Sequence, residues 1–485
     1  MPNEIATLSP QPLWGHFANL NAVPRASKKE ERVIQFMVDF GKSLGFPTHV
    51  DDIGNVIIKK PPTAGMEDRQ TVVLQSHLDM VHQKNADTTF DFATQGIKML
   101  VQGDWVKADG TTLGADNGIG VAAIMAILSS TDIPHPAIEA LFTIDEETGM
   151  TGALGLKGGL LDGSILLNLD TEDDDELTIG CAGGVDVSAR GSYVALDTPA
   201  GMSAFALTVK GLTGGHSGMD IYKGRGNANK LINRVLDGLS SYGMRIHSID
   251  GGGLRNAIPR ESHALIVLPT DKVAAATAFV QEQQKVLAAE YRSTDPELSL
   301  VLEASTPPST VIESSFQKKL LQTTYACPNG IYRMSPEIPG LVQTSNNLAR
   351  VLVKNGKYEI LCLTRSAVDS EKNDLARMIH NTFSLLGAEV ETSGDYPGWE
   401  PNPQAPIIAT MANLYREMFQ GEPKVAACHA GLECGILGTN YPHMDMISFG
   451  PNIRGAHSPD ETVQISSVQK FWTYLLETLA RVPMK

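Results

Sequence analysis

Cysteine, excess positive charge and long apolar runs are all scarce in this sequence. The five cysteines stand far apart, at positions 181, 327, 362, 428 and 434, with no CxxC pair and no zinc-ribbon spacing. An odd number of widely spaced cysteines is typical of reduced, mostly buried thiols. The sequence therefore argues against both a disulfide framework and a thiolate metal site.

Signals for a membrane or a secretory route are also lacking. The N-terminal stretch MPNEIATLSPQPLW has neither a basic start nor an apolar core, so a secretory signal is not expected. The longest apolar run, near residues 118–128, is far too short to span a bilayer. We expect a cytosolic protein with no membrane partner.

The charge balance excludes another class of partner. The formal net charge is −16, from 39 basic and 55 acidic side chains. Such a chain repels phosphate backbones, so no nucleic-acid partner is expected. With 42% hydrophobic and 19% charged residues the composition is globular, and 485 residues are too many for one ordinary core. Two or more domains are predicted.

The N-terminal third predicts an α/β domain. Ser27 and Glu30 have capping-box spacing at the start of an amphipathic pattern. Residues 117–130 are apolar on nearly every side, which indicates a helix packed on a sheet. The alternation of strand and helix favours a mostly parallel central sheet flanked by helices. Four runs of strand length support it: Asn55–Ile58, Thr71–Leu74, Ala140–Ile144 and Ile165–Leu169.

The pattern changes from about residue 188. Strand-like runs at 204–209 and 263–267 mix with two long helical patterns, which predicts a separate α+β unit. After a turn-rich stretch at 392–406, the first pattern returns, with helices near 405–419 and 464–480 and a strand at 446–449. We therefore predict one domain of residues 1–187 and 398–485, interrupted by an inserted domain of residues 188–397.

Metal-binding side chains follow the predicted strands. His77, the pair Glu146 and Glu147, Asp170 and His457 each come at or soon after the end of an apolar strand. Asp116 precedes the buried helix. Because ligands of open α/β sheets bind outside the carboxyl ends of the strands, these side chains are expected to meet.

Imidazoles and carboxylates without thiolates suit Zn²⁺, Co²⁺ or Mn²⁺. Two histidines and three carboxylates can serve two metal ions only if one carboxylate bridges. One member of the Glu146–Glu147 pair could then bind metal while the other acts as general base. Asp79, two residues after His77, is placed to hold the second nitrogen of that imidazole.

Each of these signals is weak alone. An HxD triplet occurs by chance, and a glutamate pair usually lies on a solvated surface. The acidic run at 172–176 is interpreted as solvated, and Asp170 is preferred as a ligand because it directly follows its strand. The argument for a metal site depends on the strand-end positions taken together.

The motifs SHLDMV, GADNGIG, TIDEETG, NLDTE and GAHSPDE occur in this order. They resemble the metal-binding motifs of metallopeptidase family 20, which includes carnosinases, dipeptidases, tripeptidases and N-acyl amino acid deacylases. The resemblance implies that Glu146 is the general base and that Asp79 orients a ligand. The implied ligands of the two metal ions are His77 and Asp170 for one, Glu147 and His457 for the other, and Asp116 as the bridge.

The resemblance also assigns the inserted domain. Residues 188–397 correspond to the lid of the family, which often forms a homodimer. His216 of GGHSG matches a lid histidine that polarises the scissile carbonyl group. Asn256 of RNAIP and Arg365 of LTRS match positions that contact the substrate. Gly431 and Glu433 of HAGLECG replace a different stretch found in many relatives, and Gly431 is expected to bind the substrate.

The implied activity is hydrolysis of unblocked dipeptides of broad specificity, including Xaa-His substrates. An N-acyl amino acid deacylase would use the same metal ions and base, and only the pocket for the substrate amine would differ. A silent binding protein on the same fold is the other alternative. The intact Glu146 argues against it, because a scaffold needs no general base.

Overall fold

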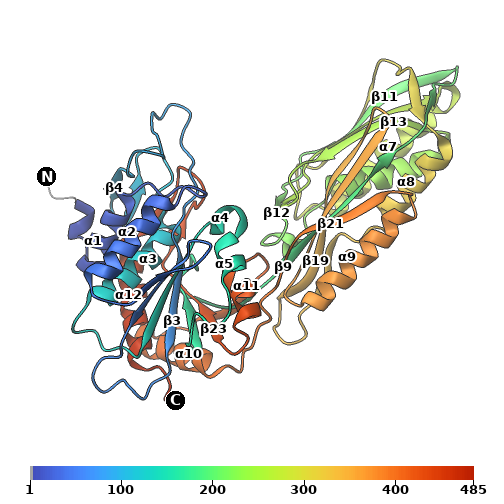
Figure 1. Ribbon diagram of the computed structural model, residues 1–485. Coiled ribbons are helices and arrows are strands. Elements are labelled where there is room, and N and C mark those ends of the chain that lie inside the picture. The colour runs from blue at the N-terminus through green and yellow to red at the C-terminus, as the bar shows by residue number, and fades with distance from the viewer. Residues whose placement is uncertain (1–3) are drawn as a thin grey trace. The chain divides into compact units, whose positions relative to one another are not determined.

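The chain forms two compact units in the computed structural model, which describes residues 4–485 (Figure 1). Unit 1 comprises the chain up to Gly180, Trp399–Ala427 and Leu432–Lys485. Unit 2 comprises Cys181–Gly398 and the short segment Cys428–Gly431. The catalytic and lid roles expected for the two parts stay predictions at this point.

The main sheet of unit 1 has eight strands in the order β1-β2-β6-β3-β7-β23-β8-β22. The four central strands, β6, β3, β7 and β23, pair in parallel, whereas β1–β2, β2–β6 and β23–β8 are antiparallel pairs. The strands are β1 (Thr48–Val50), β2 (Val56–Lys60), β3 (Val72–His77), β6 (Ile138–Thr143), β7 (Ile165–Asn168), β8 (Glu176–Cys181), β22 (Lys424–Cys428) and β23 (Asp445–Ser448).

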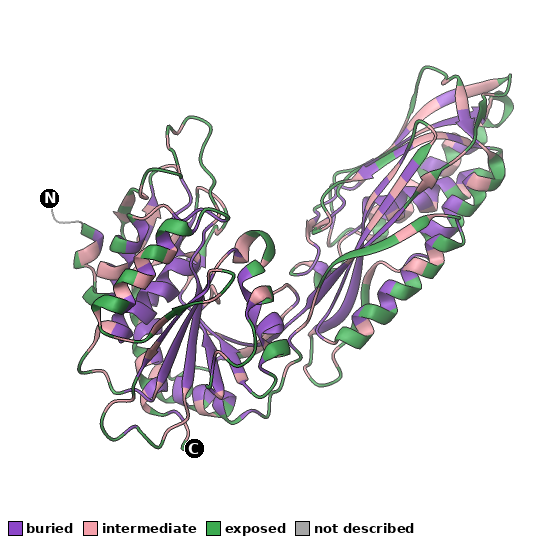
Figure 2. Ribbon diagram, in the orientation of Figure 1, coloured by how far each residue is buried: buried purple, intermediate pink, exposed green. Residues whose placement is uncertain are grey.

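Every residue of β3, β6 and β7 is buried, as Figure 2 shows in purple, which is usual for parallel strands covered on both faces. Helix α3 packs on β3, and α10 packs on β23. The helices of unit 1 are α1 (Gln11–Asn21), α2 (Glu31–Ser43), α3 (Ala115–Ser129), α4 (Glu146–Gly149), α5 (Thr151–Gly155), α10 (Pro406–Phe419), α11 (Glu433–Asn440) and α12 (Ile465–Ala480).

A second, four-stranded sheet of unit 1 has the order β24-β25-β5-β4. Its strands are β4 (Met99–Gln102), β5 (Trp105–Ala108), β24 (Ile453–Arg454) and β25 (Thr462–Gln464). The sheet therefore joins the loop before α3 to the segment between β23 and α12. Asp116 lies at the start of α3, just after the first segment, and His457 lies in the second, so this small sheet brings two distant parts of the chain to one place.

Unit 2 is built on one nine-stranded antiparallel sheet. Its order is β16-β11-β15-β13-β19-β20-β9-β21, with β18 paired to β19. The strands are β9 (Gly183–Ser192), β11 (Met202–Lys210), β13 (Arg245–Gly252), β15 (Ser262–Pro269), β16 (Ser299–Ala304), β18 (Gly330–Met334), β19 (Val342–Lys354), β20 (Lys357–Ser366) and β21 (Glu389–Tyr396). Short pairs form between β12 (Gly215–His216) and β14 (Ala257–Ile258), and between β10 (Ala195–Asp197) and β17 (Thr310–Ile312).

Figure 1 shows α7, α8 and α9 along one side of this sheet. The helices of unit 2 are α6 (Ala228–Leu239), α7 (Val273–Glu290), α8 (Ser314–Ala326) and α9 (Asp369–Ser384). Their apolar faces share one core with the sheet, in which Leu236, Ile266 and Ile360 are fully buried. Unit 2 thus has a hydrophobic core of its own.

The predicted α/β class is confirmed, although parallel pairing is confined to the centre of the main sheet. The predicted capping box is wrong. Helix α2 begins after Glu30 with no side-chain cap, and the hydroxyl of Ser27 donates instead to Asp79, 2.8 Å away. Among residues 4–485, no helix is both long and apolar enough to cross a membrane.

Candidate metal centre

The ends of three adjacent parallel strands supply the candidate site in unit 1. His77 is the last residue of β3, Glu146 and Glu147 begin α4 just after β6, and Asp170 follows β7. Because β6, β3 and β7 pair in parallel, their carboxyl ends meet at one edge of the sheet. The sequence-predicted side chains are therefore brought together.

His77, Asp116 and Asp170 form the first group able to hold a metal ion. Nε2 of His77 lies 3.1 Å from Oδ1 of Asp116 and 3.5 Å from Oδ1 of Asp170. The imidazole is fully buried, but the three acidic partners around it, including Asp79, raise its pKa well above the ordinary value.

The second group joins Asp116, Glu147 and His457. Nε2 of His457 lies 3.2 Å from Oδ2 of Asp116 and 3.0 Å from Oε2 of Glu147. These two contacts raise the pKa of His457 to about 11. The two oxygens of Asp116 thus face different groups, which is the arrangement a bridging carboxylate requires.

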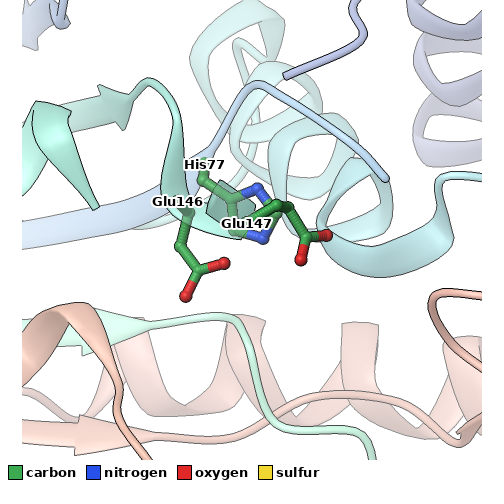
Figure 3. A group of neighbouring side chains, drawn as sticks. All are labelled: His77, Glu146 and Glu147. Carbon is green, nitrogen blue, oxygen red and sulfur yellow. The ribbon is translucent and has the colours of Figure 1, made fainter. Parts of the chain in front are cut away.

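A third group consists of His77, Glu146 and Glu147 (Figure 3). The two glutamate side chains diverge from the start of α4, with the ring of His77 beside them. Burial raises the pKa of Glu146 well above its usual range, and the nearby charges of Asp170, Glu433 and Glu147 raise it further, against the opposing charge of His77. A carboxylate whose pKa is raised in this way can accept a proton and return it near neutral pH.

Asp79 contacts both His77 and the backbone of the glutamate pair. Its Oδ1 lies 3.3 Å from Nδ1 of His77. Its two oxygens also accept the backbone N–H groups of Glu146, at 3.0 Å, and Glu147, at 3.3 Å. Burial acts to raise the pKa of Asp79, but His77, the Glu146 N–H and Ser27 together lower it. Asp79 is therefore an ionised group that fixes both the imidazole and the glutamate pair.

Glu461 is an important residue that sequence reasoning missed. Its buried carboxylate accepts four consecutive backbone N–H groups, those of Leu113, Gly114, Ala115 and Asp116, at 2.7, 2.9, 2.7 and 3.2 Å. The turn requires a positive φ of 70° at Gly114, which glycine adopts without strain. Glu461 is the last residue of the motif GAHSPDE, which also contains His457. Its place in this motif was the signal in the sequence that could have identified it.

Arg25 is the second residue that was missed. It is fully buried, and its guanidinium donates to the carbonyl oxygens of Leu78 and Asp79 and to Gly114. It therefore ties the turn after β3 to the loop before α3. No local pattern marks Arg25, because its partners lie far away in sequence.

The interpretation of residues 172–176 as a solvated run is wrong for Glu172. This side chain is half-buried, and burial, together with the charges of Asp116 and Asp170, raises its pKa to about 8. Two other members of the run do form exposed ion pairs, Asp173 with Arg454 and Asp175 with Lys424. The site is therefore more acidic than its predicted ligands alone would make it.

A family model described as peptidase family M20/M25/M40 matches residues 73–481. The chain belongs to this family. It is 43% identical to the cytosol non-specific dipeptidase of Escherichia coli K12, with the whole of both chains covered.

Solved structures agree with this membership. Aminoacylhistidine dipeptidase from Vibrio alginolyticus is 44% identical and superposes with a TM-score of 0.94, covering 100% of this chain and 99% of the other. A tripeptidase from Staphylococcus aureus has a TM-score of 0.57 at 15% identity, covering 98% and 99%, which shows a shared fold alone. The resemblance drawn from the motifs is confirmed.

M20 peptidases are metallopeptidases, so the family implies divalent metal ions, and the candidate site fits them. Oε1 of Glu147 and Oδ1 of Asp170 are buried with no hydrogen-bond donor. With only protein groups around them, His77 and His457 would stay protonated, because the neighbouring carboxylates raise the pKa of both imidazoles. A divalent cation would replace those protons and satisfy the buried oxygens.

Unit 2 contains the other predicted site residues. His216 lies in β12, and its Nδ1 accepts the backbone N–H groups of Gly218, at 3.1 Å, and Met219, at 3.0 Å. The proton of the neutral ring is therefore on Nε2, which is left as a donor. Burial and the charge of Arg365 lower the pKa of His216, so the ring is neutral near pH 7.

The other predicted site residues of unit 2 are Asn256, Arg365 and Gly431. Asn256 is exposed, and its carbonyl oxygen accepts the N–H of Ser217 at 2.7 Å. Arg365 is buried at the end of β20 and donates to the hydroxyl of Tyr396 at 2.8 Å. Gly431 closes the segment Cys428–Gly431, which packs within unit 2. Glu433, by contrast, begins α11 of unit 1. Its carboxylate accepts hydrogen bonds from the side chains of Gln75 and Thr143, each at 2.7 Å.

Proposed function

We propose that this M20 peptidase is a dipeptidase that hydrolyses unblocked dipeptides of broad specificity, including Xaa-His substrates. Full-length similarity to a non-specific dipeptidase and to an aminoacylhistidine dipeptidase supports the substrate class. The observation on which the chemistry depends is the half-buried Glu146 carboxylate beside the two candidate metal-binding groups that share Asp116.

Two divalent ions would be held by the chain's own donors. His77 and Asp170 would bind one ion, Glu147 and His457 the other, and Asp116 would bridge them. When bound, such ions act as Lewis acids and lower the pKa of water at the site. The donor set of imidazoles and carboxylates favours Zn²⁺, with Co²⁺ or Mn²⁺ as alternatives.

Glu146 would act as the general base. Its side chain would take a proton from the attacking water and later return it to the leaving amine. A raised pKa suits both steps, because the carboxylate must accept a proton and then release it. Asp79 would hold the Glu146 backbone and the His77 ring in place through the contacts described above.

His216 and Arg365 would act on the substrate. The free Nε2–H of His216 is suited to donate to the carbonyl oxygen as negative charge develops there. The guanidinium of Arg365 would bind the C-terminal carboxylate, and Asn256 and Gly431 would contact the peptide. A fixed guanidinium limits the length of the substrate, since its free carboxylate must reach that position.

We also propose a homodimer formed through unit 2. Strand β21 ends the nine-stranded sheet, and six of its eight residues are exposed. A long, accessible edge strand is a ready surface for pairing with a second copy. Sedimentation analysis would test this, and a monomer at micromolar concentration would contradict it. A cytoplasmic location follows by analogy with the similar cytosolic dipeptidase.

One experiment tests the function. Purified protein is analysed for bound metal and then assayed with free dipeptides, tripeptides and N-acetyl amino acids. We expect two ions per chain and efficient cleavage of free dipeptides, including β-alanyl-histidine. Preference for N-acetyl amino acids would establish the deacylase alternative, and an inactive, metal-loaded protein would overturn the proposal.

A further inference from the structure

The short segment Cys428–Gly431 has an unusual place in the fold. Its neighbours on both sides belong to unit 1, yet the segment itself packs within unit 2. The backbone N–H of Ala182, just before β9, donates to the carbonyl oxygens of both Cys428, at 3.1 Å, and Ala430, at 3.0 Å. The first part of the motif HAGLECG is therefore fixed to the start of the unit 2 sheet.

The side chain of His429 is directed to the strand pair that contains Arg365. It is only 7% exposed, and its Nε2 forms a 2.7 Å hydrogen bond with the hydroxyl of Ser345. Ser345 on β19 is the register partner of Arg365 on β20. Burial, together with the charges of Arg365 and His216, lowers the pKa of His429 to about 3, so the ring is neutral.

The backbone of His429 contacts the loop that contains His216. A Cβ atom added to Gly218 would lie 2.0 Å from the carbonyl oxygen of His429, so no side chain fits there. The N–H of this same Gly218 donates to Nδ1 of His216 and helps to fix its tautomer. One residue thus has a side-chain contact towards Arg365 and a backbone contact towards His216.

We propose that His429 is a positioning residue that holds Arg365 and His216 in a fixed relation to each other. Its hydrogen bond to Ser345 fixes the end of the β19–β20 pair, and its carbonyl oxygen fixes the loop at Gly218. The Nε2 of His429 is already engaged with Ser345, so we assign its effect to these two neighbours and not to direct contact with the substrate. This inference rests on the proposed dipeptidase function.

Two amide replacements of different length test the hydrogen bond. His429→Gln places an amide nitrogen near the position of Nε2, whereas His429→Asn is too short to reach Ser345. We expect His429→Asn to raise the Michaelis constant for free dipeptides about tenfold, as loss of a buried hydrogen bond implies, while His429→Gln stays close to wild type. With C-terminally amidated dipeptides the three proteins should differ little, because that substrate does not need a well-placed Arg365.

Ser345→Ala gives a milder test that removes only a hydroxyl group. It should reproduce the effect of His429→Asn, and the double variant should show no further loss, since both changes remove the same bond. Gly218→Ala should instead lower the turnover number, because it displaces the His216 loop. Melting temperatures are recorded for every variant.

Wild-type kinetics with His429→Asn, equal losses on free and amidated substrates, or additive effects of Ser345→Ala and His429→Asn would each overturn the inference. These outcomes differ from failure of the proposed function, in which the wild-type protein itself would not cleave free dipeptides.

Discussion

Oδ1 of Asp79 lies 3.3 Å from Nδ1 of His77, and the same carboxylate accepts the N–H groups of Glu146 and Glu147. A single side chain thus orients a candidate metal ligand and the candidate base. Sequence spacing can suggest the first contact, but the second depends on how β3 and β6 pair.

Asp79→Asn should weaken metal binding 10–100-fold, the usual effect of removing a carboxylate that orients a histidine ligand. Competition with a chromogenic chelator would measure the affinity. Ser27→Ala is the matched control, because it removes one hydrogen bond to Asp79 and leaves the charge in place. Equal affinities for Asp79→Asn and wild type would refute the role assigned to Asp79.

Glu146→Gln should lower the turnover number by about 10²–10⁴ while the metal content stays unchanged, since the amide cannot accept a proton. The neighbouring Glu147→Gln should behave differently and lose metal as well as activity. Steady-state kinetics and elemental analysis of the two variants distinguish the roles. Near wild-type turnover by Glu146→Gln would show that another group is the base.

Asp116→Ala should lose both metal ions, because the two oxygens of Asp116 face different groups. His457→Ala removes a contact from only one group and should retain about one ion per chain. Metal stoichiometry after dialysis measures both. A fully active wild-type protein with a single ion would rule out the bridged arrangement.

His216→Ala and Arg365→Ala should have different kinetic signatures. Loss of the His216 donor should lower the turnover number about 10²–10³-fold, because that hydrogen bond strengthens in the transition state. Loss of Arg365 should mainly raise the Michaelis constant, and amidating the dipeptide should add little further loss in this variant. Unchanged turnover by His216→Ala, or efficient cleavage of long peptides by wild type, would contradict the proposed substrate contacts.

Glu433 should make stability depend on pH. Burial, with the charges of Asp170 and Asp79, raises its pKa to about 7 in the folded protein, against about 4.3 in an unfolded chain. Between these values the folded state retains a proton that the unfolded chain has lost. The stability that this proton provides is complete below the unfolded pKa and is lost as pH rises through 7.

From pH 5.5 to 8.5 this loss should be about 2 kcal/mol. Glu433→Gln keeps an acceptor for Gln75 and Thr143 but does not titrate. Its melting temperature relative to wild type should therefore increase over this range, at equal metal content. A constant difference would show that Glu433 is already ionised at the lower pH.

Strands β3, β6 and β7 were predictable because they are short, fully buried and mainly apolar. The clustering of the candidate ligands was predictable because most of them follow those strands. The first half of β19 was not. Gln343, Thr344, Ser345, Asn346 and Asn347 are all buried there although they are polar. Hydropathy patterns assume that buried residues are apolar, so a strand that buries a hydrogen-bonded polar network gives no signal.

The supporting contacts of the site were missed for a related reason. Glu461 and Arg25 act through backbone groups of distant loops, which any sequence can supply. Ser27 had the spacing of a helix cap, but a tertiary hydrogen bond to Asp79 replaced that local one. Residue type and spacing predict which candidate ligands lie together, whereas they do not predict which side chains hold the loops that carry them.

Strand β23 lies between β7 and β8 in the main sheet, although Cys181–Gly398 separates it from both in sequence. Because a ribosome makes the chain from its N-terminus, unit 2 is complete while the sheet of unit 1 still lacks one of its inner strands. His457 and Glu461 emerge later still. A growing chain therefore lacks the complete set of candidate metal-binding groups until nearly all of it has been synthesised.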